Sequence, residues 1–315
     1  MTASEEPPAG VGGVKIGVLS LQGAFAEHQS LLESILPPGR VSSARQVRTP
    51  AELSGLDGLV LPGGESTAMG LIGDATPGMW DALREFVGSG QPVWGTCAGL
   101  ILLAERCVGT SAVISEGQAL IGGCDVLVCR NYFGSQISSF ELSTPPPPGD
   151  ESGIDYPGVF IRAPAILSAG PNVEVLARVV ATPCRQAAVV LRELENKIEA
   201  GESVVMMEVV DALDRKDGRL DYVEVKRDSG TGVAKEEKKD AEGGGQPKFV
   251  LPGAADITNA REVICVIRQG NILCSAFHPE LTGDARWHNF FVAMVEENAA
   301  ERRRRTQVGT PSSSS

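Results

Sequence analysis

The sequence predicts an α/β fold in which a doubly wound, mostly parallel sheet is flanked by helices. Short apolar runs at Val14–Ser20, Gly58–Pro62 and Pro92–Gly95 have the length and composition of buried strands. Helical patterns at Ala24–Leu36 and Pro77–Gly88 alternate with them. Such alternation is typical of parallel sheets, in which ligands bind beyond the carboxyl ends of the strands.

The segments that complete the sheet contain more strands than helices. Residues 121–180 are rich in strand-forming residues. Val263–Arg268 and Ile272–Phe277 form a predicted hairpin, because the glycine–asparagine pair between them suits a tight turn. A last helix is expected from Ala285 to about Ala300.

Composition divides the chain into an ordered part and three segments without a core pattern. The stretch Lys226–Pro247 is charged and glycine-rich, and it contains almost no large apolar residues. Such a segment cannot bury enough surface to offset the entropy that is lost on ordering. We therefore expect a flexible leader at 1–13, a single domain formed by 14–180 and 262–300, a largely disordered insertion at 181–261 and a flexible tail at 301–315.

Composition also limits the partners and the compartment. The 315 residues carry a formal net charge of −12, which argues against nucleic acid as the main partner, since phosphate binding needs a basic surface. The seven cysteines lie mostly within apolar strands, which favours free thiols in a reducing compartment. No cysteine–histidine cluster has metal-ligand spacing, and neither a signal peptide nor a membrane span is expected. These features predict a cytoplasmic protein without a metal.

The segment Gly95–Gly99, with the sequence Gly-Thr-Cys-Ala-Gly, is typical of a nucleophile elbow. It follows a strand and leads into a helix that is expected over Gly99–Arg106. Small neighbours permit the sharp turn, and the thiol of Cys97 then lies at a helix N-terminus, where the macrodipole stabilises a thiolate. The alternative is a buried structural cysteine between two closely packed glycines.

A candidate base and a candidate acid follow the last predicted strand. Pro279 biases His278 toward an extended conformation, in which residues two apart project to the same side, so Glu280 is expected to reach the His278 ring. A histidine oriented by a carboxylate is the general base of a catalytic triad. The other two histidines, His28 and His288, lie in helical patterns and are expected to be solvated or packed side chains.

Two glycines after another strand complete the pattern. Gly63 and Gly64 follow the strand at Gly58–Pro62, and paired glycines allow backbone N–H groups to point into a pocket, as in an oxyanion hole. The N–H of Ala98, next to the candidate nucleophile, is the natural second donor. An ordinary turn is the alternative for the glycine pair alone.

These motifs resemble the glutaminase subunits of pyridoxal 5'-phosphate synthase, a branch of the class I (triad) glutamine amidotransferases. The elbow and the His-Pro-Glu segment are shared with all class I glutaminases, whereas the other segments indicate the vitamin B6 branch. The resemblance covers about 14–180 and 262–297, lapses between them, and implies a flavodoxin-like fold. The segments that carry it are Leu21–Gly23, Pro62–Thr67, Gly95–Leu100, Arg130-Asn131, Phe160–Pro164 and Phe277–Thr282.

The resemblance implies hydrolysis of L-glutamine to glutamate and ammonia, without a cofactor. Cys97 is then the nucleophile, His278 the base and Glu280 the acid that orients it, with the N–H groups of Gly64 and Ala98 as the oxyanion hole. For the arginines, which suit the substrate carboxylate, a surface salt bridge is the alternative. The residues implied to line the glutamine pocket are Gly64, Glu65, Ser66, Arg130, Ile161 and Arg162.

The resemblance also implies a protein partner. The ammonia is expected to pass to a separate synthase subunit, a (β/α)8 barrel, since this chain shows no second catalytic domain. Gln22 is the candidate contact through which the barrel subunit gates the Gly63-Gly64 loop. The family commonly has an arginine where this chain has Ser135, so one contact at the pocket edge or the partner surface differs.

Three other functions stay open on the sequence. The first is the glutaminase of another ammonia-using synthase, such as that of histidine biosynthesis, although Phe160–Pro164 argues against it. The second is a thiol-dependent stress protein of the same fold, which would lack the His-x-Glu pattern ending at Glu280. The third is a catalytically inert interaction subunit, and the complete set of triad positions weighs against it.

Overall fold

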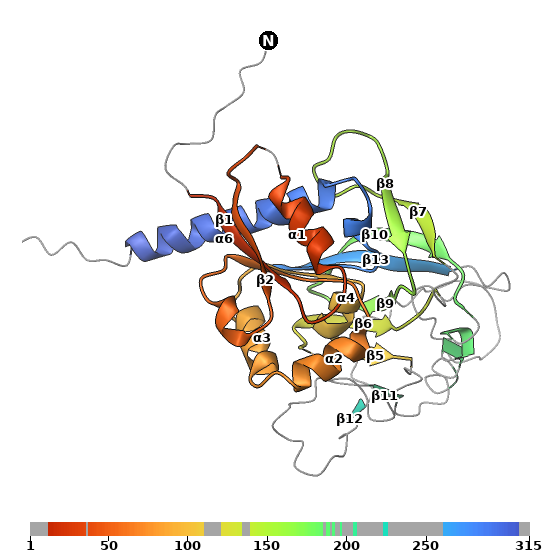
Figure 1. Cartoon of the computed structure of the whole chain (residues 1–315). Coiled ribbons are helices and arrows are strands. Elements are labelled where there is room, and N and C mark those ends of the chain that lie inside the picture. Colours follow the sequence, from red (N-terminus) through yellow and green to blue (C-terminus); the bar gives the residue numbers. More distant parts are fainter. Residues whose placement is uncertain are drawn as a thin grey trace, which may run out of the picture.

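The computed structural model describes residues 12–35, 37–109, 121–133, 139–184, 187–189, 191–192, 196, 204–206, 223–225 and 261–308. The largest sheet of this part has ten strands in the order β2-β1-β3-β4-β14-β13-β9-β6-β5, with β10 beside β13 (Figure 1). These strands are β1 (Val14–Leu19), β2 (Val41–Val47), β3 (Gly58–Leu61), β4 (Val93–Thr96), β5 (Ala104–Val108), β6 (Cys124–Cys129), β9 (Ala165–Ala169), β10 (Glu174–Ala181), β13 (Arg261–Gln269) and β14 (Ile272–Ser275).

The sheet has a parallel part and an antiparallel part. Strands β2, β1, β3, β4 and β14 pair in parallel with one another in this order, which confirms the predicted parallel sheet. Strand β13 is antiparallel to β14, β9 and β10. The predicted hairpin is confirmed, because Gln269 of β13 pairs with Ile272 of β14 across the two-residue turn.

Helices cover both faces of the sheet (Figure 1). Helices α1 (Phe25–Glu33) and α6 (Arg286–Val308) lie on one face, and α2 (Ser66–Asp74), α3 (Met79–Gly88) and α4 (Ala98–Leu103) lie on the other. Helix α3 shows why such segments are helical: its buried residues Met79, Trp80, Leu83 and Phe86 recur at the spacing of one helix face.

Three helix ends differ from the prediction. Helix α1, expected up to Leu36, ends at Glu33. The helix expected up to Arg106 ends at Leu103, and the chain continues directly as β5. The apolar composition of this stretch is compatible with either a helix or a strand. It forms a strand because β5 pairs with β6. The last helix, α6, is longer than expected and continues to Val308.

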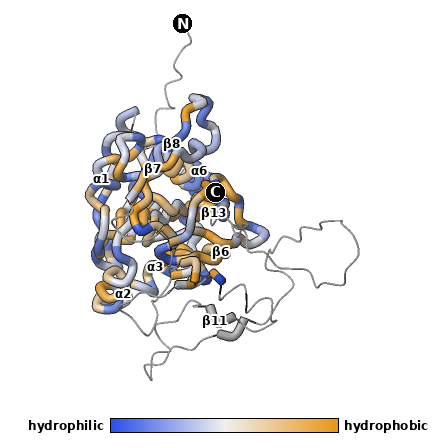
Figure 2. The backbone as a smooth tube through the Cα atoms, turned by 90° about the vertical axis from the view of Figure 1, so that its right-hand side faces the viewer, coloured by the Kyte–Doolittle hydropathy of each residue, from blue (hydrophilic) through white to orange (hydrophobic). Residues whose placement is uncertain are grey.

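The core follows the strands. Figure 2 shows hydrophobic residues along β6 and β13, and Val126, Val128 and Val266 are among those fully buried there. A separate two-stranded sheet, β7 (Phe140–Thr144) with β8 (Tyr156–Phe160), lies beside the main one. Its rings extend the core, because Phe160 packs against Phe277 with ring centroids 5.7 Å apart. None of the described helices is long and apolar enough to cross a membrane.

The expected insertion at 181–261 is described only in short pieces. Ala187 and Leu191 are buried in the core. Strands β11 (Val204–Met206) and β12 (Val223–Val225) pair antiparallel. The stretch Lys226–Pro247, for which disorder is predicted, lies outside the described residues, as do residues 1–11 of the leader and 309–315 of the tail.

Candidate active site

The predicted site residues follow the carboxyl ends of neighbouring parallel strands. Gln22 follows β1, Gly63 and Gly64 follow β3, Cys97 follows β4 and His278 follows β14. Because these four strands are adjacent and parallel, their ends lie along one edge of the sheet. The topology therefore places segments more than 200 residues apart in the chain next to one another.

The elbow at Cys97 is a strained turn packed between backbone segments. Cys97 has φ of 47° and ψ of −99°, and positive φ is rare for residues other than glycine. Its N–H donates to the carbonyl of Ser275 on β14 (2.8 Å). A Cβ on Gly95 would collide with the backbone of Gly99, and a Cβ on Gly99 would collide with the backbone of Leu61. The predicted strand–turn–helix is confirmed, and backbone packing explains both of its glycines.

His278 and Glu280 form a buried pair. Nδ1 of His278 lies 2.7 Å from Oε1 of Glu280, and the residues are 7% and 5% exposed. The contact was predicted from an extended conformation, and that reason was wrong. Residues Pro279–Leu281 form a 3-10 turn, and this tighter turn brings the carboxylate to the ring.

The charges of the site support one another. Burial by itself lowers the pKa of His278, but the charge of a Cys97 thiolate, a hydrogen bond to it and the Glu280 carboxylate outweigh burial and raise this pKa to about 11. Burial by itself raises the pKa of Glu280, but its neighbours His28 and His278 hold that pKa well below its usual range. The raised pKa favours the imidazolium form of His278, which lies against the Glu280 carboxylate.

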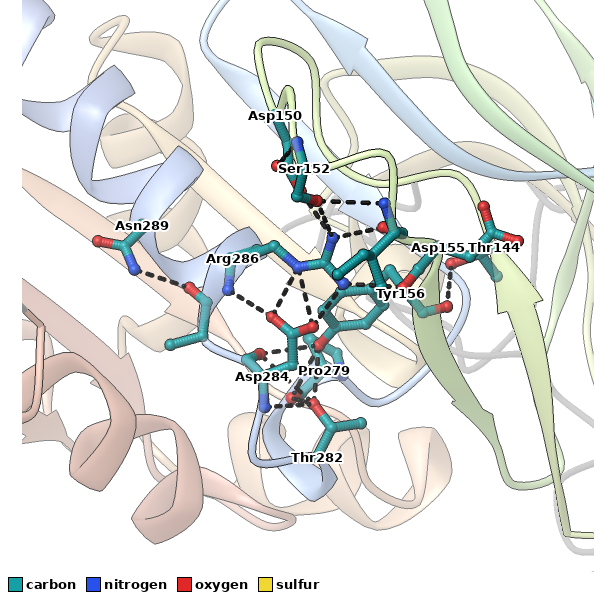
Figure 3. A network of polar contacts seen from close by, with 12 residues as sticks. Thr144, Asp150, Ser152, Asp155, Tyr156, Pro279, Thr282, Asp284, Arg286 and Asn289 are labelled. Carbon is teal, nitrogen blue, oxygen red and sulfur yellow. Dashed lines mark hydrogen bonds and ion pairs between the residues drawn. The ribbon is translucent and has the colours of Figure 1, made fainter.

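The turn that carries this pair is anchored from outside by Tyr156 and Arg286 (Figure 3). The Tyr156 hydroxyl lies 3.2 Å from the carbonyl oxygen of Pro279, 3.2 Å from that of Asp284 and 2.9 Å from the Thr282 hydroxyl. Arg286, at the start of α6, lies over the Tyr156 ring and forms an ion pair with Asp284 (2.6 Å). These contacts connect β8 and α6 to the turn.

One neighbour of the pair was missed from the sequence. Nε2 of His28, on α1, lies 3.2 Å from Oε2 of Glu280, and Nδ1 of His28 lies 2.9 Å from Nε2 of His288. Both histidines are fully buried, so the expectation of packed side chains is confirmed and that of solvated ones is wrong. The available signal was the spacing of His28 and the buried Leu32, which lie four residues apart on one face of α1.

The Gly63-Gly64 loop lies beside the elbow and is held by the chain that follows β1. The carbonyl of Gly63 accepts a hydrogen bond from the N–H of Ala24 (3.0 Å). The side-chain oxygen of Gln22 accepts one from the N–H of Glu65 (2.7 Å). Because the C=O and N–H of a trans peptide point in opposite directions, the N–H of Gly64 points away from Ala24.

Arg130 is a buried cation beside this loop. It is 7% exposed, and its guanidinium donates to the Ser66 hydroxyl (2.8 Å) and lies 3.4 Å from the Thr67 hydroxyl. Burial lowers the pKa of Arg130. It forms no ion pair within the part of the chain that the structure describes, so a surface salt bridge does not explain it. The Glu65 carboxylate instead caps α2, accepting from the N–H groups of Thr67 (3.2 Å) and Ala68 (2.7 Å).

The other predicted pocket residues follow β8. Ile161 and Arg162 are half-buried, and Arg162 has φ of 47°. Among the described non-glycine residues, positive φ occurs at Cys97, Asn131 and Arg162, each within a segment that the sequence motifs single out. Such a conformation costs about 1–3 kcal/mol and concentrates at functional sites. Ser135 lies outside the described residues.

Six further cysteines lie outside the elbow. All seven cysteines are free thiols. Burial raises the pKa of Cys107, Cys129 and Cys265 to about 12, so these thiols stay protonated at neutral pH. No cluster of histidine, cysteine and carboxylate side chains suited to a metal ion occurs within the described ranges.

Comparison with known proteins agrees with these motifs. Residues 18–214 match the model of the SNO glutamine amidotransferase family. The chain is 38% identical over 285 residues to a probable pyridoxal 5'-phosphate synthase subunit PDX2 of Arabidopsis thaliana, which covers 90% of this chain and 86% of the plant protein. It is 46% identical over 165 residues to the pyridoxal 5'-phosphate synthase subunit PdxT of Deinococcus radiodurans, covering 51% of this chain and 78% of the bacterial protein.

The fold is also similar to that of a solved protein. A crystal structure described as a glutamine amidotransferase superposes with a TM-score of 0.54 and 29% sequence identity. The superposition covers 89% of this chain and 98% of the other. The family match runs to residue 214, past residue 180, where the sequence motifs lapse.

Proposed function

The chain belongs to the SNO glutamine amidotransferase family, and on this premise we propose that Cys97, His278 and Glu280 hydrolyse L-glutamine to glutamate and ammonia. The observation that carries the proposal is the buried imidazole–carboxylate contact of 2.7 Å beside a strained cysteine at a helix N-terminus. Its relatives are named as subunits of pyridoxal 5'-phosphate synthase. The chain is accordingly a glutaminase of vitamin B6 biosynthesis.

The proposed reaction starts from a Cys97 thiolate and a His278 imidazolium. The sulfur bonds to the side-chain amide carbon, and the carbonyl electron pair moves to the oxygen, where the N–H groups of Gly64 and Ala98 stabilise it. One such donor is typically worth about 3–4 kcal/mol. His278 then gives its proton to the leaving ammonia as the carbon–nitrogen bond breaks, and a thioester remains. Neutral His278 next takes a proton from water, which attacks the thioester, releases glutamate and restores the thiolate.

Arg130 is the proposed partner of the substrate α-carboxylate. Its buried guanidinium bonds to two hydroxyl groups, and the charge of Glu65 acts on it although that carboxylate is bonded to the N-terminus of α2. A buried cation needs a paired counter-charge. A planar guanidinium binds a carboxylate through two parallel hydrogen bonds. The proposed pocket is lined by Gly64, Glu65, Ser66, Arg130, Ile161 and Arg162, where Glu65 contributes through its backbone because its carboxylate caps α2.

The proposed partner is a (β/α)8-barrel synthase subunit that receives the ammonia. The names of the relatives support such a partner, since each is called a subunit of the synthase. The proposed setting is the cytoplasm, in keeping with seven free thiols. Co-purification with the barrel subunit, rather than with another ammonia-using synthase, separates this proposal from its nearest alternative.

The test is glutamine hydrolysis by the purified chain, with and without the synthase subunit of the same organism. We expect weak release of glutamate alone and much stronger release with the partner. A Gly63-Gly64 peptide that must reorient at a cost of about 2–3 kcal/mol would suppress the free chain about 30- to 150-fold. Absence of glutamate in both conditions contradicts the proposed function. Equal rates in both contradict only the gating.

Gln22 offers a sharper test of the gating. Its side chain holds the N–H of Glu65, directly after the Gly63-Gly64 peptide, at 2.7 Å. We therefore expect Gln22→Ala to lower stimulation by the partner more than it lowers basal turnover. Gln91→Ala is the matched control, because Gln91 bonds to the carbonyl of Leu56, in another part of the fold. Equal losses in stimulation and basal rate contradict a gating role for Gln22.

A further inference from the structure

We propose that His28 is a positioning residue for the acid of the triad, holding the second carboxylate oxygen of Glu280 while His288 fixes the direction of that contact. The inference rests on the proposed function, since it assigns a role within the same site. His28 lies on α1 and His288 on α6, so two helices far from the elbow in sequence take part.

Glu280 needs a second positioning residue because its carboxylate has two oxygens and His278 contacts only one of them. Oε1 is occupied by the His278 ring. Oε2 faces Nε2 of His28 at 3.2 Å, in a geometry short of an aligned hydrogen bond, and among the described residues no other group bonds to it. An unpartnered carboxylate oxygen in a fully buried position is costly. The His28 ring is the group placed to satisfy it.

The positions of the protons follow from this placement. An ionised carboxylate can only accept, so Nε2 of His28 carries the proton that faces Glu280. With Nε2 of His28 turned to Glu280, we assign Nδ1 of His28 as the acceptor of a hydrogen bond from Nε2 of His288, 2.9 Å away. This leaves Nδ1 of His288 without a proton, which agrees with its having no hydrogen-bond partner among the described residues. Burial holds the pKa of His288 well below its usual range, so this ring is neutral.

The residues around His28 and His288 shield the two rings from solvent. The Trp94 ring packs edge-on against both imidazoles, with centroids 5.6 Å from His28 and 4.9 Å from His288. The Thr96 hydroxyl lies 3.2 Å from Nε2 of His28 and is a second acceptor for its proton. The titratable groups that face Glu280 are His278 from its own turn, His28 from α1, His288 from α6 and Tyr156 from β8.

The kinetic test compares His28→Leu with His28→Gln. Leucine fills the space without a donor, whereas the glutamine amide can direct an N–H to Glu280. Loss of the partner raises the pKa of Glu280, so the acid becomes protonated, and activity is lost, at a higher pH than in the wild type. We expect His28→Leu to lower kcat about 10-fold with KM unchanged and to move the acid limb of kcat upward by about one pH unit. We expect His28→Gln to restore most of the kcat and most of the position of the acid limb.

A second measurement does not depend on glutamine hydrolysis. The chain has three histidines, so nitrogen-15 NMR of the imidazole rings resolves each tautomer, with assignment by single substitutions. At pH 8 we expect both His28 and His288 as the tautomer protonated on Nε2. If the chain releases no glutamate but both rings show these tautomers, the proposed function is contradicted. The contact between His28 and Glu280 is supported all the same.

Two results would overturn the inference. The first is a His28 ring protonated on Nδ1. The second is a folded His28→Leu variant, judged by its Tm, with the kcat and acid limb of the wild type. A His28→Gln variant as impaired as His28→Leu also counts against it, because that result assigns His28 a packing role alone.

Discussion

Cys97 and the His278–Glu280 pair lie at neighbouring strand ends, yet the chain holds them in place by different means. The elbow is built from backbone contacts, since Gly95 and Gly99 pack against main-chain atoms with no room for a Cβ. The turn with the base and the acid is held by side chains, among them Tyr156 from β8, Arg286 from α6 and His28 from α1.

The difference determines what a substitution can do. A backbone contact cannot adapt when a side chain is added, so changes at the elbow act on the fold and the reaction together. A side-chain contact to the turn can be removed while the backbone keeps its path. Changes there are expected to alter the orientation and pKa of the base and acid more than the stability of the protein.

The largest expected effect is the loss of the nucleophile. Cys97→Ala should lower kcat at least about 10⁴-fold, because removing one member of a triad disables the whole unit. His278→Asn should be nearly as severe, and Glu280→Gln milder, because the base remains but is less well oriented. Ammonia release with the synthase subunit measures these rates, and thermal melting checks that each variant is folded. Near-normal turnover of Cys97→Ala contradicts the assignment.

A methyl group at the elbow should affect stability as well as activity. Gly99→Ala places a Cβ against the carbonyl of Leu61, and such overpacking typically costs about 1–3 kcal/mol. Gly88→Ala is the matched control, because a Cβ at Gly88, the last residue of α3, meets nothing within 4 Å. Urea unfolding of the two variants measures the difference. Equal stability would show that the elbow is not tightly packed.

Removing the Tyr156 hydroxyl should weaken the turn that carries His278 and Glu280, with a smaller loss of activity and stability than the changes above. Tyr156→Phe keeps the ring under Arg286 but leaves the carbonyls of Pro279 and Asp284 without this donor. We expect kcat to fall about 10-fold or less and the stability to fall by about 1 kcal/mol. A loss of stability without any change in kcat would contradict the distinction between the two regions.

The smallest effect is expected outside both regions. Deleting Lys226–Pro247 should leave glutaminase activity and Tm nearly unchanged, because its composition cannot sustain packing. Limited proteolysis provides an independent check, since the segment should be cut in the free protein. Protection from protease, or a collapse of the Tm on deletion, would contradict this prediction.

The elbow could be predicted from the sequence more completely than the turn with His278 and Glu280. Local patterns predicted the elbow at Cys97, the β13–β14 hairpin and the individual strands β1, β3 and β4, because each depends on residues close together in the chain. The contact of His278 with Glu280 was predicted, although the 3-10 turn that makes it was not.

The supports of that turn could not be predicted in the same way. His28 contacts an acid 252 residues later in the chain, and Tyr156 contacts a carbonyl 123 residues later. The spacing of neighbouring residues in the sequence does not predict such contacts, because they form only when α1, β8 and α6 pack on the sheet. The end of α4 at Leu103 also depends on a contact between distant segments. The residues that follow Leu103 form β5 because they pair with β6.

The activation of Cys97 by the neighbouring turn is tested most directly by covalent labelling with a glutamine analogue that alkylates the active nucleophile, mapped by mass spectrometry on the complex with the synthase subunit. We expect one label per chain on Cys97, slower labelling in His278→Asn and none in Cys97→Ala. The six other thiols supply the internal control, because burial keeps at least Cys107, Cys129 and Cys265 protonated. A label on another cysteine, or labelling of Cys97 at the same rate in His278→Asn, would contradict a nucleophile activated by the neighbouring turn.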